Sequence, residues 1–155
     1  AREKTPIFST QDAPFELGKA YVLKEGADVS LLGTGTMTYQ LLIAAKLLET
    51  KGIHAEVVHV PTIKPLDQET ILASARKTGR VVTAEEAQAA GGFGSAVTEF
   101  LSEVLPMPVK RIGINDRFGE SGAPNELIEY FGLSGDKLAK TVEDFIEKMP
   151  RYHQN

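Results

Sequence analysis

The sequence predicts an α/β domain, namely a three-layer α/β/α sandwich around a mostly parallel sheet of about five strands. Two observations lead to this prediction. Short runs of apolar and β-branched residues alternate with stretches of roughly 10–15 residues whose apolar positions recur at helical spacing. Such alternation is typical of βαβ units, and their right-handed crossovers place helices on both faces of the sheet.

The strands are expected where β-branched residues cluster between turn signals. The run 55–60 is the clearest, because valine occupies half of its positions. The first strand is short and ends at the turn signal formed by Glu25 and Gly26. The expected strands are 19–23, 29–32, 55–60, 81–84 and 109–114.

The helices are expected from the spacing of apolar residues and from stop signals. In 37–51 the apolar positions fall on one helical face, and Gly52 ends the helix. A second helix opens at Pro65 and Asp67 and stops at Gly79. The expected helices are 37–51, 65–77, 95–104, 125–131 and 136–149.

We expect one domain over residues 1–150. A chain of 155 residues suits a single compact core, and no linker, repeat or low-complexity tract interrupts it. Residues 1–14 are expected to form an irregular lead-in, since Pro6 and Pro14 oppose regular structure, and residues 151–155 a frayed tail.

The composition narrows the class of protein. Hydrophobic residues make up 42% of the chain and charged residues 25%, as in ordinary soluble domains. The net charge of −4 and the lack of a basic cluster argue against a nucleic-acid partner. Without cysteine there are no disulfides or thiolate metal sites, and no apolar run is long enough to span a membrane. The amino terminus has neither an apolar signal core nor an initiator Met, so we expect a cytoplasmic chain, either a trimmed subunit or a fragment.

Four loops are expected at the carboxyl edge of the sheet, where open parallel sheets bind ligands. They are 33–36, 61–64, 85–92 and 115–122. These loops would bring seven polar side chains into one neighbourhood: Lys64, Glu85, Glu86, Gln88, Asp116, Arg117 and Glu120.

The first loop is a candidate small-anion site. It consists of Gly33, Thr34, Gly35 and Thr36, which follow a strand and open a helix. Glycine permits a tight turn, and free N–H groups at a helix start favour anions. A dinucleotide fingerprint is incomplete, because Thr38 replaces its third glycine and His59 stands where the acidic ribose partner belongs. The turn therefore either binds a small anion or is purely structural.

The remaining polar residues do not form a recognisable catalytic or metal site. In 91–95 we favour close helix–sheet approach over phosphate binding, because Glu85 and Glu86 would repel an anion. These carboxylates, with Asp116 and Glu120, could act as acid and base or bind a hard cation, but helix caps and ion pairs are the favoured interpretation. His54 and His59 should point to opposite faces of a strand, which makes them poor joint metal ligands.

A succession of segments resembles one family. The segments are 15–20, 23–29, 62–67, 83–86, 91–97, 111–114, 118–122, 126–127 and 130–133. Together they resemble the C-terminal domain of transketolases over nearly the whole chain. The segment 118–122 in particular is similar to the C-terminal section of a split transketolase.

The resemblance implies transfer of a two-carbon ketol unit between sugar phosphates in the pentose phosphate pathway, with thiamine diphosphate and a divalent metal (Mg²⁺) as cofactors. In that family two other domains hold the cofactor, through a Gly-Asp-Gly motif that is missing here and a glutamate in the second of those domains. We therefore expect no catalytic, cofactor-binding or metal-binding residue in this chain and no activity of the chain alone. Its expected partners are the thiamine-binding N-terminal and middle domains of the same enzyme, assembled as a homodimer to which it contributes scaffold and contacts.

Alternatives stay open at this point. Deoxyxylulose-phosphate synthases and the beta subunits of 2-oxoacid dehydrogenases share this domain. A stand-alone module that binds an anion or nucleotide, or an interaction module that has lost the chemistry, would also have this fold.

Overall fold

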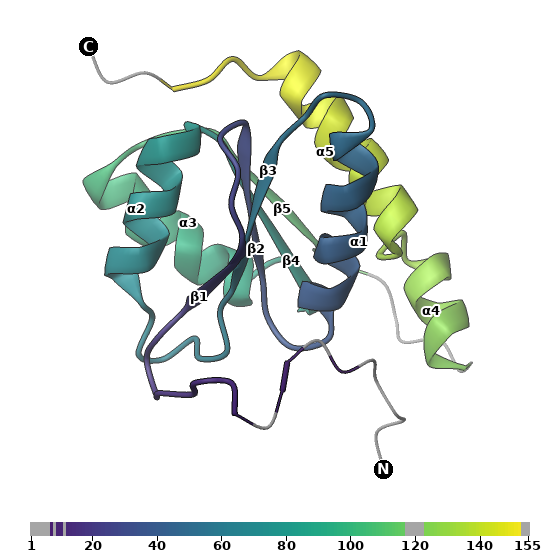
Figure 1. Ribbon diagram of the computed structural model, residues 1–155, viewed down its shortest axis with the longest axis horizontal. Coiled ribbons are helices and arrows are strands. Elements are labelled where there is room, and N and C mark those ends of the chain that lie inside the picture. The colour runs from purple at the N-terminus through teal and green to yellow at the C-terminus, as the bar shows by residue number, and fades with distance from the viewer. Residues whose placement is uncertain (1–6, 8, 11, 117–122, 153–155) are drawn as a thin grey trace.

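A computed structural model describes residues 7, 9–10, 12–116 and 123–152 (Figure 1). Its strands are β1 (Tyr21–Lys24), β2 (Val29–Gly33), β3 (Ala55–His59), β4 (Val81–Gln88) and β5 (Val109–Ile114). Its helices are α1 (Met37–Glu49), α2 (Gln68–Thr78), α3 (Phe93–Val104), α4 (Pro124–Tyr130) and α5 (Gly135–Lys148).

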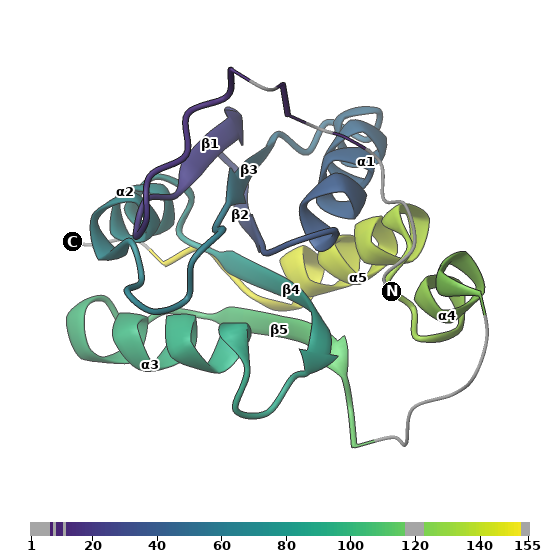
Figure 2. The ribbon, with the colours of Figure 1, turned by 90° about the horizontal axis from the view of Figure 1, so that it is seen from below.

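The five strands form one sheet in the order β1-β3-β2-β4-β5. All neighbouring pairs are parallel except β1 with β3, which is antiparallel. Figure 2 shows α1, α4 and α5 on one face of the sheet and α2 and α3 on the other. The predicted three-layer sandwich with a mostly parallel sheet is confirmed.

Each face of the sheet has its own apolar core, because successive strand residues point to opposite faces. In β2, Leu31 packs in the core beneath α1 and α5, and its neighbour Leu32 packs in the core beneath α2 and α3. Both leucines are fully buried. The continuous burial of β2 and most of β3 is the pattern expected of central parallel strands.

Local signals explain how α2 begins and ends. Asp67 caps its start by accepting a hydrogen bond from the N–H of Thr70. Gly79 ends it in a left-handed conformation with φ of 70°, and its N–H donates to the carbonyl of Ala75. The helix therefore begins at Gln68, three residues later than the predicted start at Pro65.

Two predicted boundaries were wrong near the carboxyl edge. Strand β4 does not end at Ala84 but continues to Gln88, so residues 85–88 are strand rather than loop. The pairing with β5 shifts register between Ala84 and Gln88, which accommodates the extra residues. Helix α3 begins at Phe93, two residues before its predicted start.

Candidate functional site

The carboxyl ends of the parallel strands lie together at one edge of the sheet, the lower edge in Figure 1. The chain leaves β2 toward α1 on one face and leaves β4 toward α3 on the other, although β2 and β4 are neighbours. Open α/β sheets bind ligands in the crevice outside such a pair of strands. The described part of the lead-in before β1 runs along this same edge (Figure 1).

The carboxylate of Glu85 caps the N-terminus of α3 at this edge. Glu85 is only 3% exposed. Its two oxygens accept hydrogen bonds from the N–H groups of Phe93, at 2.8 Å, and Gly94, at 2.9 Å. A Cβ added to Gly92 would lie 2.1 Å from Oε2 of Glu85, so glycine is required for this approach. The close-approach interpretation of 91–95 is confirmed by Gly94, where an added Cβ would lie 2.5 Å from Oγ1 of Thr83 on β4. The protein itself supplies the negative charge that the helix start favours.

Arg111, on β5, holds the loop between β4 and α3. Its Nη1 donates to the carbonyl of Ala89, at 2.9 Å, and to Oγ of Ser95, at 2.8 Å. Oγ of Ser95 in turn accepts from the N–H of Gly91 at 2.9 Å. The loop is thus fixed by one side chain from β5 and one from α3.

The predicted small-anion site lies in the turn between β2 and α1. It comprises Gly33, Thr34, Gly35 and Thr36. The side chain of Thr36 makes no capping hydrogen bond. The N–H groups of Met37 and Thr38 donate to carbonyls within the turn at 3.3 Å, so these two donors are already engaged. Binding of an anion here stays a prediction.

Thr38 and His59 join the first helix to the end of β3. Oγ1 of Thr38 lies 2.7 Å from Nδ1 of His59, and Thr38 is fully buried. Burial lowers the pKa of His59 below its usual value of 6.5, while a hydrogen bond to the carbonyl of Gly33 acts in the opposite direction. A neutral imidazole is favoured, which suits a structural link between two elements.

The other predicted edge residues do not converge on one centre. The N–H of Asp116 donates to Oε1 of Gln88 at 3.1 Å, and Lys64 is exposed in the loop after β3. Arg117 and Glu120 lie outside the described residues. Within the described ranges, no group of three His, Asp or Glu side chains is arranged to hold a metal ion.

Glu86 borders an apolar hollow of about 200 Å³ between the sheet and α4. Glu86 itself is exposed, and the register shift in β4 lies around it. The other lining residues are Ile114, Leu127, Ile128, Phe131 and Leu133. One carboxylate beside apolar side chains offers no acid–base pair.

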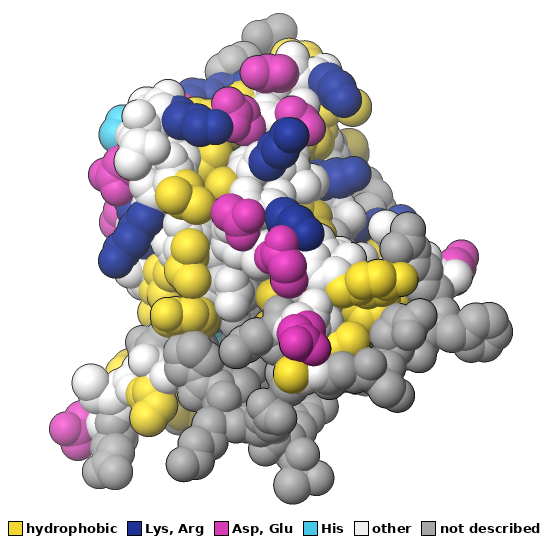
Figure 3. All heavy atoms as spheres, turned by 90° about the vertical axis from the view of Figure 1, so that its right-hand side faces the viewer, with side chains coloured by type: hydrophobic (Ala, Val, Ile, Leu, Met, Phe, Trp, Pro, Cys, Tyr) yellow, Lys and Arg dark blue, Asp and Glu magenta, His cyan; other side chains and the backbone are white. Residues whose placement is uncertain are grey.

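Large apolar side chains are exposed beside the same edge. Phe15 and Leu17, between the lead-in and β1, are 70% and 69% exposed, and Ile63, in the loop after β3, is 42% exposed. Surface apolar residues that stand close together mark interaction sites more often than isolated ones do. By contrast, Figure 3 shows Lys, Arg, Asp and Glu side chains of both signs interspersed over the upper part of the face formed by the α1 and α5 layer.

Comparison with known proteins identifies the family. Residues 18–138 match the model for the C-terminal domain of transketolase. The chain belongs to the transketolase C-terminal domain family. None of the helices in the described ranges is both long and apolar enough to cross a bilayer.

Three relatives illustrate the range of this family. The chain is 46% identical over 139 residues to the 6-deoxy-6-sulfo-D-fructose transketolase subunit SqwH of Clostridium sp. (strain MSTE9), covering 90% of this chain and 43% of that protein. It is 44% identical over 138 residues to the 1-deoxy-D-xylulose-5-phosphate synthase of Trichormus variabilis, covering 88% of this chain and 22% of the synthase. The solved structure of a split-gene transketolase, an inactive beta4 tetramer, matches with a TM-score of 0.90 and 46% identity over 96% of this chain and 49% of that chain.

The transketolase C-terminal domain thus spans less than half the length of the curated relatives it matches. These relatives include transketolase subunits, and the neighbouring structure is a transketolase encoded by split genes. Each of these proteins therefore contains further chain beyond the part that this chain matches.

The sequence favoured helix caps for the carboxylates of this edge, and the cap by Glu85 confirms this, but the sequence did not indicate which helix Glu85 caps or where exposed apolar side chains lie. The sequence contains a signal for the Glu85 cap, because this acidic residue precedes Phe93, in a glycine-rich helix start, by eight positions. The signal for the exposed apolar side chains is weaker: Phe15 and Leu17 are large apolar residues in a stretch without helical or strand periodicity.

Proposed function

We propose that this chain is the C-terminal domain of a thiamine-diphosphate-dependent transketolase, which transfers a two-carbon ketol unit between sugar phosphates. The observation that carries this proposal is its match to a split-gene transketolase at a TM-score of 0.90 over 96% of the chain. In this proposal the domain contributes scaffold and subunit contacts, and the complete enzyme is a cytoplasmic homodimer of the pentose phosphate pathway.

The described residues do not fit the diphosphate and Mg²⁺ of the cofactor. A diphosphate needs free N–H donors, but those at the start of α3 are engaged by Glu85. A divalent metal needs clustered oxygen ligands, and the described part of the chain has no such cluster. We therefore assign cofactor binding to the thiamine-binding domains or subunit of the same enzyme, and no catalytic residue to this chain.

Calorimetry and a domain graft test this proposal together. Thiamine diphosphate with Mg²⁺ is titrated into the purified chain, for which we expect no heat of binding. The chain then replaces the matching segment of the Clostridium SqwH subunit, and ketol transfer is measured with the complete enzyme. Restored transfer supports the proposal, whereas tight cofactor binding by the chain alone would overturn it.

A second candidate is the C-terminal domain of a deoxyxylulose-phosphate synthase. It is favoured by the 44% identity to the Trichormus synthase. The same graft made in that synthase separates the two candidates. Restored activity in the synthase but not in the transketolase would favour this second function.

A further inference from the structure

We infer that the exposed apolar side chains of Phe15, Leu17 and Ile63 form the docking surface for the thiamine-binding part of the same enzyme. We refer to these three residues as the lead-in surface. The inference rests on the proposed function and adds to it the place on this chain where the partner binds.

The lead-in surface is built by two segments that are far apart in the sequence. The N–H of Gly18 donates to Oγ1 of Thr62 at 2.9 Å, and the N–H of Ala20 donates to Oδ2 of Asp67 at 2.8 Å. Leu17 and Ile63 are the sequence neighbours of Gly18 and Thr62, so these hydrogen bonds bring both side chains to the same region. The segment that carries Phe15 and Leu17 is thus held on the domain by its backbone.

Phe15 and Leu17 are among the most exposed large apolar side chains of the described residues. Phe15 and Leu17 are each about 70% exposed, although the cores of the same domain bury side chains of equal size completely. Removing an exposed Leu or Phe side chain from water is favourable in proportion to the apolar area that is buried. Three such side chains in one region therefore favour an apolar partner surface.

The partner is the part of the enzyme that lies outside the matched region. The matched region is 43% of the SqwH subunit and 49% of the split-gene transketolase chain. In each of these proteins the unmatched part is therefore longer than the matched part. The family is named for a C-terminal position, so we place the additional chain of the relatives before the matched region, which begins at residue 18 of this chain. Phe15 and Leu17 stand immediately before that point, where the preceding domain is closest in sequence.

The experiment uses the graft of this chain into the SqwH subunit and compares substitutions on the lead-in surface with a substitution at an exposed apolar residue elsewhere. The test variant carries Leu17→Asp and Ile63→Asp, and a milder one carries Leu17→Ser and Ile63→Ser. The control is Val104→Asp, because Val104 is 45% exposed, close to the 42% of Ile63, and ends α3 at the opposite edge of the sheet. Circular dichroism melting of the ungrafted chain checks that each variant folds.

We expect the aspartate variant to lose about tenfold or more of the ketol-transfer activity of the graft, and the serine variant to lose less. Calorimetry of the aspartate graft should show the domain melting in a transition of its own, while the Val104→Asp graft behaves like the parent. If the aspartate graft and the serine graft both keep the activity of the parent graft, and the domain still melts together with the rest of the subunit, the docking surface is overturned and the proposed function stands. A parent graft without ketol transfer and with separate transitions would overturn both.

Discussion

At the scale of single residues, Glu85 decides how the carboxyl edge is built. Its buried carboxylate accepts two backbone hydrogen bonds from the first turn of α3. The sequence placed Glu85 near a glycine-rich helix start and predicted that it would repel an anion there. Spacing alone could not show that the side chain turns back onto the helix, because this depends on the continuation of β4 beyond Ala84.

Removing this carboxylate should destabilise the domain. We expect Glu85→Ala to lower the free energy of unfolding by about 2–3 kcal/mol, because two charge-assisted hydrogen bonds and a helix cap are lost. Urea unfolding measures the change. Glu86→Ala is the matched control, since Glu86 is exposed, and it should change stability by less than about 0.5 kcal/mol. Equal effects of the two substitutions would refute the assigned role of Glu85.

Asp67 should make the stability of the domain depend on pH in the acid range. Burial acts to raise its pKa, but hydrogen bonds from Ala20 and Thr70 outweigh it and hold the pKa below the usual value of 3.8. Because the unfolded chain binds the proton more readily, this stabilisation is present above pH 3.8 and is lost as the pH falls toward the folded value. When the free energy of unfolding is measured from neutral pH down into the acid range, it should fall less in Asp67→Asn than in the parent. Asp144→Asn, at an exposed position, should follow the parent curve.

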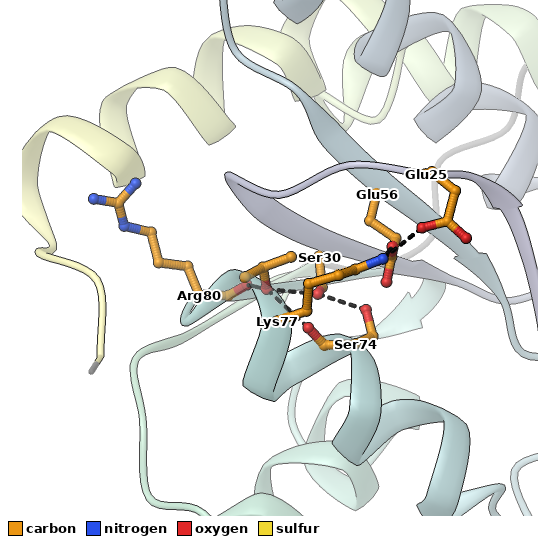
Figure 4. Close-up of polar contacts among 7 residues, drawn as sticks. Glu25, Ser30, Glu56, Ser74, Lys77 and Arg80 are labelled. Carbon is orange, nitrogen blue, oxygen red and sulfur yellow. Dashed lines mark hydrogen bonds and ion pairs between the residues drawn. The ribbon is translucent and has the colours of Figure 1, made fainter. Parts of the chain in front are cut away.

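At the scale of elements, a buried charge joins β3 to α2. Glu56 is 1% exposed and pairs with Lys77, which also pairs with Glu25 at 2.5 Å (Figure 4). Hydrogen bonds to Glu25 and Glu56 hold the pKa of Lys77 above its usual value. Beside this group, Oγ of Ser30 lies 2.6 Å from Oγ of Ser74, so hydroxyl groups satisfy one another between β2 and α2.

Loss of the lysine should be costly because it leaves a carboxylate buried without a counter-ion. We expect Lys77→Met to destabilise the domain by about 2 kcal/mol or more, near the lower end for buried pairs, since Lys77 itself is 41% exposed. Lys51→Met breaks the exposed pair with Glu143 and should cost about 1 kcal/mol or less. Thermal unfolding of both variants under the same conditions measures the two losses of stability. A smaller loss from Lys77→Met than from Lys51→Met would contradict the role of the buried charge.

Element boundaries were predicted less well than the elements themselves. Strong periodicity and β-branched runs indicated each of the strands and helices found in the described residues. The end of β4 and the start of α3 were missed because a register shift and a side-chain cap set them. Both are tertiary contacts, which local sequence patterns do not encode.

At the scale of the whole molecule, one sheet couples two cores. Leu41 packs in the core beneath α1, and Ile71 packs in the core beneath α2; both are fully buried. The alternation of strands and helices in the sequence was sufficient to predict this layered arrangement. It could not predict where the exposed lead-in surface lies, because the location depends on which side chains the layers leave uncovered.

The two cores should unfold together. We expect Leu41→Ala and Ile71→Ala each to lower the unfolding free energy by about 3 kcal/mol, since each leaves a cavity in a packed core. Because both cores share the strands between them, calorimetry should show a single transition whose calorimetric and van't Hoff enthalpies agree in either variant. Two resolved transitions would show that the layers on the two faces are separate folding units.

The cap on α3 has a consequence for competition among ligands. A dissolved anion competes for a helix start through its concentration, whereas Glu85 is tethered only eight residues from the N–H group it binds. A flexible tether already gives an effective concentration of about a millimolar, and a rigid strand that holds the carboxylate in place raises this value much further. A dissolved phosphate or nucleotide would therefore have to displace Glu85, one of the domain's own side chains, before it could bind at this helix start.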